Sequence, residues 1–217
     1  MDKLISLIES VESLLAGFEE GDSDKKSHVA AVEAAIGWEL PYEVRSFLVN
    51  TSSANTEEIS PIFMGYELID VKSLARMYKE PGCGDAGCCL FLFECASPDE
   101  KFVLGDDEGY TVIEDLEGEV EDGVMECDMK RIVPIMEASG FYIVLFHKSD
   151  QTTEIAVAAE DYTLSSLAPS LTAYLENLKV GVEKGVFEVD MEGEFEDGYY
   201  EIEAPESWKE RVDAISY

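Results

Sequence analysis

Residues 32–48 read VEAAIGWELPYEVRSFL, and this stretch decides the fold. Val32 and Ile36 lie one helical turn apart, and Gly37 follows as a residue that readily adopts the positive φ of a helix C-cap. Pro41 then restarts the chain, because the N–H that proline lacks would be unpaired at the first position of a helix anyway. The stretch therefore predicts one helix that ends at Gly37 and another that begins at Pro41.

Apolar residues recur at helical spacing in five segments of the chain. The expected helices cover residues 2–18, 27–36, 41–49, 71–78 and 167–180. Asp70 is the expected N-cap of the fourth helix, because its carboxylate can accept the unpaired N–H groups of a first turn. Four of these helices come early in the chain, so the sequence predicts a helical N-terminal half.

The second half of the chain changes to short runs of β-branched and aromatic residues, which favour strands. Two such runs are expected to form a hairpin around the acidic turn DDEG at residues 106–109. The apolar runs before and after this hairpin predict buried strands of one sheet. The expected strands cover residues 88–95, 102–104, 110–113, 132–134, 141–146 and 155–158.

Three segments, in the same order, resemble the signature of the SMI1/KNR4 (SUKH) family. The first is residues 32–48, in which a helix containing Glu is followed by Gly, Leu-Pro and a helix that ends in Phe-Leu. The second is residues 131–145, RIVPIMEASGFYIVL, an apolar-Pro-apolar strand followed by a central strand. The third is residues 167–178, LAPSLTAYLENL, which is similar to the closing segment of the family. Two departures are Val44, where an aromatic residue is usual, and Asn50-Thr51, where the family has Asn-Gly or Gly-Gly.

The resemblance implies an α+β fold with a central mixed or antiparallel sheet and packed helices. A single SUKH-like domain is expected over residues 1–182. It carries an acidic insertion near residues 81–128, which are longer than the usual link of the family. Residues 183–217 lie beyond the usual end of the family and are expected to be an acidic C-terminal extension. Bacterial domains of this kind resemble immunity proteins that neutralise a cognate toxin, often a nuclease, and eukaryotic ones resemble regulatory adaptors or scaffolds.

The charge of the chain restricts its partners. Lys and Arg total 15 against 48 Asp and Glu, which gives a formal net charge of −33. Binding to nucleic acid needs clustered Lys and Arg, and an anionic membrane surface would repel this chain. We therefore expect a basic protein partner, with neither nucleic acid nor membrane as a direct partner. The alternative is that the charge serves solubility alone, and the oligomeric state stays open.

The candidate partner-binding residues lie in an acidic run and beside it. A basic cleft in a toxin would attract such a run, while an aromatic side chain would supply binding energy. The alternative is a solvated loop with its aromatic residues in the core. The candidates are Glu114, Asp115, Glu117, Glu119, Glu121, Asp122 and Tyr110, with Tyr199, Tyr200 and Trp208 as further possible anchors.

Neither a metal site nor a cofactor is expected. Cys83, Cys88, Cys89 and Cys95 have the spacing C-x4-C-C-x5-C, which differs from the paired pattern of structural zinc sites. The acidic turns that end at Gly109 and at Gly193 both lack ligands that an EF-hand calcium loop requires. We therefore assign no metal-binding and no cofactor-binding residue.

Catalysis has little support in the sequence. The chain has two histidines, His28 and His147, and contains no nucleophile elbow, phosphate-binding loop or dinucleotide fingerprint. A glycoside hydrolase needs only two carboxylates, so an acid-residue hydrolase is kept as the less favoured alternative. We expect a non-enzymatic binding protein and name no catalytic residue.

The sequence also predicts a cytoplasmic location. Residues 1–18 alternate apolar and acidic residues, unlike a cleavable signal peptide. No apolar run approaches the roughly 20 residues of a membrane span. The five cysteines, an odd number without an export signal, indicate reduced thiols.

Overall fold

The computed structural model describes residues 2–51, 59–63, 66–79, 99, 101–106, 110–112, 125–138, 141–158 and 163–183. Five α-helices are described in these parts: α1 (Asp2–Leu14), α2 (Ser23–Ile36), α3 (Tyr42–Asn50), α5 (Val71–Lys79) and α7 (Leu171–Glu183). Three short 3-10 helices connect them or precede strands: η1 (Phe18–Glu20), η2 (Ser60–Phe63) and η3 (Met129–Arg131). Within the described residues, no helix is both long and apolar enough to span a membrane.

The described strands form one sheet of eight strands in the order β1-β5-β6-β7-β8-β3-β2-β4. Every neighbouring pair runs antiparallel. The strands are β1 (Glu67–Leu68), β2 (Lys101–Asp106), β3 (Tyr110–Val112), β4 (Met125–Asp128), β5 (Ile132–Ala138), β6 (Phe141–His147), β7 (Thr153–Ala158) and β8 (Thr163–Ala168). The fold is therefore α+β with an antiparallel sheet and packed helices, which confirms the expected class.

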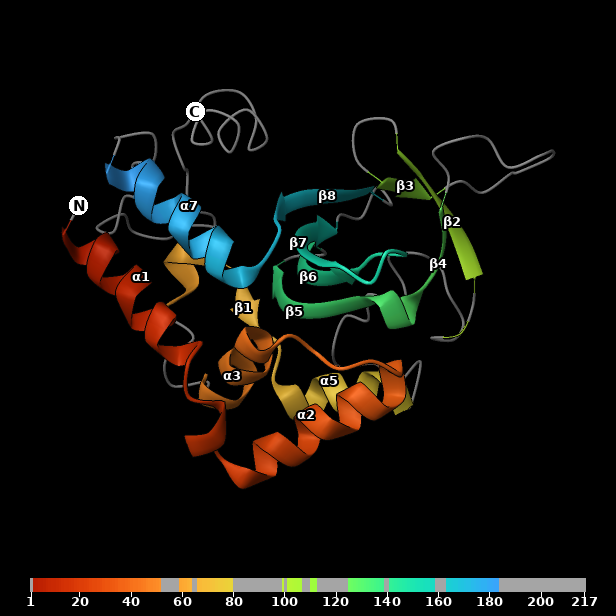
Figure 1. Ribbon diagram of the computed structural model, residues 1–217, viewed down its shortest axis with the longest axis horizontal. Coiled ribbons are helices and arrows are strands. Elements are labelled where there is room, and N and C mark those ends of the chain that lie inside the picture. Colours follow the sequence, from red (N-terminus) through yellow and green to blue (C-terminus); the bar gives the residue numbers. More distant parts are fainter. Residues whose placement is uncertain are drawn as a thin grey trace.

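The helices gather around one end of the sheet. Figure 1 shows α1 and α7 side by side at the left of the sheet, with α2, α3 and α5 below it. Strands β2, β3 and β4 extend at the opposite end, on the right. Strands β5 and β6 lie at the centre of the core, because Ile132–Met136 and Tyr142–Phe146 are all buried. A sheet buried on this scale provides a rigid base for the loops and helix ends above it.

Local hydrogen bonds set both ends of α2. Gly37 adopts φ +85° and donates its N–H to the Glu33 carbonyl at 2.9 Å, so the predicted end of this helix is confirmed. The helix begins earlier than predicted, at Ser23, because the Asp22 carboxylate accepts the N–H groups of Asp24 and Lys25. These two bonds hold the pKa of Asp22 below its ordinary value.

The structure corrects the predicted start of one helix by one position and confirms the predicted cap of another. Pro41 is the N-cap of α3 and so stands one position before the helix that it was expected to open. Asp70 accepts the N–H groups of Lys72 and Ser73 at 3.1 and 3.3 Å, which confirms it as the cap of α5. The predicted hairpin is also confirmed, because β2 and β3 pair with Asp106 opposite Tyr110.

The predicted helix over 167–180 is wrong at its start. Leu167 and Ala168 belong to β8, where both are buried and Ala168 pairs with Ile155 of β7. The helix α7 begins at Leu171, where the Ser170 hydroxyl accepts the Ala173 N–H at 3.0 Å. Helical spacing could not reveal this boundary, because the pairing with β7 is a long-range contact.

The first helix is also shorter than predicted and ends at Leu14 rather than near Phe18. The Leu14 carbonyl accepts hydrogen bonds from Ser46 and Asn50 of α3, at 2.7 and 3.2 Å. Phe18 stands in the separate turn η1. The apolar run at 88–95 and the C-terminal extension beyond residue 183 lie outside the described residues.

Candidate protein-binding site

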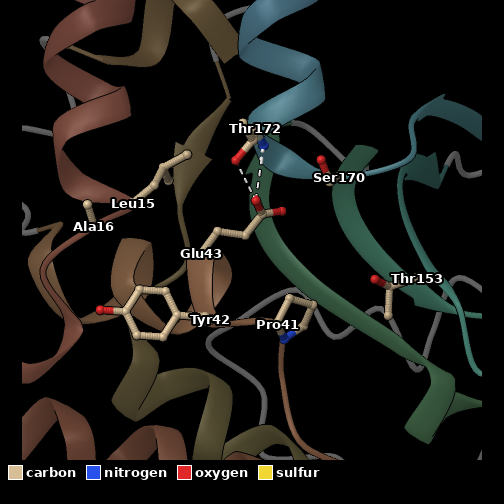
Figure 2. A pocket seen from close by; sticks show the side chains of 8 residues that line it. All are labelled: Leu15, Ala16, Pro41, Tyr42, Glu43, Thr153, Ser170 and Thr172. Atoms are coloured by element: carbon tan, nitrogen blue, oxygen red, sulfur yellow. Dashed lines mark hydrogen bonds between the residues drawn. The ribbon is translucent and has the colours of Figure 1, made fainter.

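An open pocket of about 560 Å³ lies where four elements of the chain meet. The end of α1, the start of α3, the start of β7 and the start of α7 each contribute to its walls. Figure 2 shows Glu43 in the middle, Tyr42 and Leu15 on one side, and Pro41, Thr153 and Ser170 on the other. The lining residues are Leu15, Ala16, Pro41, Tyr42, Glu43, Thr153, Ser170 and Thr172.

Glu43 joins α3 to the start of α7. One carboxylate oxygen accepts the Leu171 N–H at 2.7 Å, and the other accepts the Thr172 N–H at 3.4 Å and its hydroxyl at 2.5 Å. These donors are the unpaired groups of a helix first turn, to which a negative charge is attracted. Glu43 thus fixes the relative position of two helix starts that border the pocket.

Tyr42 forms one wall of the pocket and is 48% exposed. Its ring meets the Phe18 ring edge-to-face, with centroids 6.2 Å apart. The Phe18 ring is in turn covered by Arg45 at 5.3 Å and Lys26 at 5.6 Å. A large aromatic side chain held by a neighbour and open to solvent is a typical anchor for a protein partner.

The end of α1 is tied to α3, which positions Leu15 and Ala16 at the pocket. The buried Ser46 hydroxyl accepts the Gly17 N–H at 2.8 Å and donates to the Leu14 carbonyl. Because Ser46 is one of few buried polar side chains, pairing both its donor and its acceptor matters for stability.

A second set of bonds positions Pro41. The Glu33 carboxylate accepts the Leu40 N–H at 2.9 Å and lies 3.9 Å from the Arg45 guanidinium. Arg45 also pairs with Glu39 at 2.5 Å. The loop between α2 and α3 is therefore held from both sides, and the pocket edge is preformed.

The described lining of the pocket combines one carboxylate with hydroxyl groups and apolar side chains. This described lining holds one carboxylate, from Glu43, three aliphatic hydroxyls, from Thr153, Ser170 and Thr172, and the phenol of Tyr42. A glycoside hydrolase would require a second carboxylate across the pocket, and the described lining contains none. Among the residues that the structure describes, no three His, Cys, Asp or Glu come together to hold a metal ion.

None of the predicted partner-binding residues is among the described residues that line this pocket. The backbone of Tyr110 lies in β3, at the end of the sheet away from α1 and α7. The acidic run lies outside the described residues, as do the other possible anchors and the four clustered cysteines. These residues are Glu114, Asp115, Glu117, Glu119, Glu121, Asp122, Tyr199, Tyr200, Trp208, Cys83, Cys88, Cys89 and Cys95.

The sequence interpretation missed the pocket because its residues come from distant segments. Pro41, Tyr42 and Glu43 stand inside the stretch that predicted the fold, where their neighbours are core residues. The available signal was the exposed aromatic-acid pair directly after Leu-Pro, at the start of a helix.

Two histidines and one cysteine of the described residues lie outside the pocket lining. His147 ends β6 and stacks on Trp38, with ring centroids 4.4 Å apart and planes 15° from parallel. Burial, and next the positive charge of Arg131, lower the pKa of His147 below its ordinary value. His28 lies within α2. Burial raises the pKa of the Cys127 thiol to about 12, so this cysteine stays protonated and unreactive.

Basic side chains in the described residues are largely engaged within the molecule. Several pair with carboxylates, including Lys148 with the buried Glu154 at 2.5 Å and Lys179 with Glu9 at 3.3 Å. Others donate to backbone carbonyls, as Lys26 does to Glu19 at 2.6 Å. The engaged residues are Lys25, Lys26, Arg45, Lys101, Lys130, Arg131, Lys148 and Lys179. Because the chain has 48 acidic residues and 15 basic ones, these pairs leave most of its carboxylates without a basic partner in the same chain.

Comparison with known proteins identifies the fold family. The model of the SMI1 / KNR4 family (SUKH-1) matches residues 25–177, which run from α2 into α7. No curated protein and no solved structure matches the chain. The matched part contains the Gly37, Pro41 and Glu43 positions around which the helix ends are built. Because the match covers well over half of its length, the chain belongs to the SMI1/KNR4 (SUKH-1) family.

Proposed function

We propose that this chain is a non-enzymatic immunity protein that binds a basic toxin domain, such as a nuclease, and neutralises it by covering its active cleft. The expected cytoplasmic location belongs to the same proposal. The observation that carries it is the net charge of −33, together with the pairing of several described basic side chains with carboxylates of the same chain. Family membership supports a binding role, because the SUKH resemblance implies immunity proteins in bacteria.

The charge of the inhibitor is opposite to the charge that the toxin's cleft needs. A cleft that binds nucleic acid must present positive charge to the phosphates. An inhibitor of opposite sign is steered toward such a cleft, which raises the association rate by orders of magnitude at low salt. An acidic surface also disfavours binding to nucleic acid and to anionic membranes, so the charge selects a basic protein.

The first experiment captures the partner with the full-length chain. The tagged chain is immobilised and exposed to lysate of its source cells at 50 mM and at 500 mM NaCl, about a tenfold range that spans weak to strong screening. Mass spectrometry then identifies the bound proteins, and the purified partner is assayed for nuclease and other toxic activity. We expect one basic partner that is released by salt and inhibited when bound.

A matched pair of variants locates the interface. Reversing Glu117, Glu119 and Glu121 to Lys changes the predicted acidic run. The control makes the same change in charge at Glu19, Glu20 and Glu176, which are exposed on the helical part. We expect the first variant to slow association by about tenfold and the control to have a clearly smaller effect.

Other outcomes would contradict the proposal in defined ways. Several partners without toxicity would favour the regulatory adaptor of the same family. Equal slowing by both variants would remove the acidic run from the interface and leave only general attraction. Absence of any partner at either salt concentration would overturn the binding role.

A further inference from the structure

We propose that the pocket beside Tyr42 and Glu43 receives a lysine side chain from the basic partner. This inference rests on the proposed function for the identity of the partner, but the site itself is argued from the geometry. The pocket measures about 560 Å³, which accommodates a lysine together with part of the loop that presents it. The described residues that line it come from other segments than the acidic run predicted from the sequence, which lies outside the described residues.

The charge of the pocket favours a cation. Glu43 supplies a carboxylate, and none of the described residues that line the pocket is a lysine, an arginine or a histidine. None of the ion pairs of the described residues involves Glu43, so no cationic side chain is seen to neutralise it. The positive end of the α7 dipole amounts to about half a charge, which offsets only part of this carboxylate.

The polar groups are arranged for an ammonium group. Hydroxyls of Thr153, Ser170 and Thr172 line the pocket; that of Thr172 donates to Glu43, Ser170 precedes α7, and Thr153 stands apart from Glu43 at the start of β7 (Figure 2). They are single oxygen acceptors on separate residues, which suits the three donors of a lysine ammonium. A planar guanidinium instead favours a bidentate carboxylate, and both oxygens of Glu43 already accept bonds from α7.

The apolar walls suit the methylene stem of lysine. Leu15, Ala16 and Pro41 line the pocket together with the face of Tyr42. A lysine can cover such a wall with its carbon chain while its charged end stays among polar groups. The Tyr42 ring adds attraction for a cation, and its contact with Phe18 at 6.2 Å holds it in place.

The test uses the full-length chain and a defined probe. The blocked tripeptide acetyl-Gly-Lys-Gly-amide is titrated into ¹⁵N-labelled protein, and amide chemical shifts map where it binds. The norleucine analogue of the tripeptide lacks the ammonium group and controls for apolar binding. We expect saturable shifts around residues 42–43, 153 and 170–172 with the lysine peptide only.

Two matched pairs of variants separate the pocket from general attraction. Tyr42→Ala removes an exposed aromatic wall, while Phe141→Ala removes the other large exposed hydrophobic side chain among the described residues, which is not part of the described lining. We expect Tyr42→Ala to lower the affinity for the lysine peptide by about two- to fivefold, the range of an exposed cation–π contact. We expect Phe141→Ala to leave this affinity unchanged.

The second pair places a charge inside or outside the pocket. Thr153→Lys puts an ammonium group into the pocket, whereas Ser165→Lys adds the same charge at an exposed position of β8, opposite Val157. We expect Thr153→Lys to abolish saturable binding of the peptide and Ser165→Lys to weaken it only slightly. Circular dichroism of each variant checks that the fold is retained.

The outcomes distinguish this inference from the proposed function. Shifts scattered over the acidic surface, or equal effects within each pair, would overturn the lysine pocket while leaving capture of a basic partner unaffected. Stronger binding of the corresponding arginine peptide would overturn the assignment to lysine. Peptide shifts that appear only after removal of residues 184–217 would show that the chain's own extension occupies the pocket and would also overturn the proposal.

Discussion

Glu43 connects two helices that are far apart in the sequence. Its carboxylate accepts three hydrogen bonds from Leu171 and Thr172, which lie 128 and 129 positions further along the chain. Hydrogen bonds to an ionised acceptor are about twice as strong as neutral ones, so this one side chain contributes to stability as well as to pocket shape. A similar link is made by Trp38, which donates to the Lys130 carbonyl at 2.8 Å and stacks on His147.

At the residue scale, we predict that Glu43→Gln destabilises the protein by about 1–2 kcal/mol, because a charged cap of α7 is replaced by a neutral one. Urea denaturation followed by circular dichroism measures the free energy of unfolding. The control is Glu176→Gln, an exposed acid in the middle of α7, which we expect to change stability by less than about 0.5 kcal/mol. Equal effects of the two substitutions would show that the bonds of Glu43 contribute nothing beyond its charge.

At the scale of elements, β1 and β5 place two carboxylates opposite each other. Glu67 of β1 pairs in register with Glu137 of β5. Burial, and next the charge of Glu67, raise the pKa of Glu137 above its ordinary value of 4.5. The ionised form of Glu137 is therefore disfavoured in the folded state, and this end of the sheet carries a local cost at neutral pH.

We predict that Glu137→Gln raises the melting temperature at pH 7.5. The sign follows from the raised pKa: the folded state binds the proton more tightly than the unfolded state, so wild-type Glu137 costs stability while it is ionised. The gain should shrink as the pH falls through the raised pKa, where the wild-type carboxyl becomes neutral. Differential scanning fluorimetry between pH 7.5 and pH 4.5 measures both effects.

The exposed Glu67 provides the control for this strand pair. Glu67→Gln removes the repulsion but leaves the burial of Glu137, which is the larger cause of its raised pKa. We therefore expect a smaller gain from Glu67→Gln than from Glu137→Gln. The reverse order would show that repulsion rather than burial disfavours the charge.

At the scale of the whole molecule, the net charge of −33 opposes compaction. The fold resists this repulsion through its buried sheet and through ion pairs such as that of Lys148 with Glu154. Salt screens the long-range repulsion between exposed charges more than it screens a buried pair. The same salt weakens steering toward a basic partner, so stability and association are expected to respond to salt in opposite directions.

We predict that raising NaCl from 20 to 500 mM, about a 25-fold increase that shortens the screening length well below 10 Å, raises the melting temperature by at least about 2 °C. Thermal unfolding followed by circular dichroism measures the change. A variant with Glu19, Glu20 and Glu176 changed to Gln carries less charge on the exposed helical part and should gain less from salt. A fall in melting temperature with salt would mean that the ion pairs outweigh the repulsion.

The amino-acid sequence by itself determined the features that depend on near neighbours. The helix end at Gly37 and the cap at Asp70 were predictable, because each is completed by groups within four residues. The resemblance of three segments to the SMI1/KNR4 (SUKH) family, with the α+β class that it implies, was also visible in the sequence, and the acidic character followed from composition.

Only the tertiary structure decided what depends on distant contacts. Leu167 is a strand residue rather than a helical one because β8 pairs with β7, and helical spacing carries no information on that pairing. The pocket exists because Glu43 meets Leu171 across 128 positions and the end of α1 is bound by α3. Such contacts are selected by the packing of the whole core, so no local pattern in the sequence could place them.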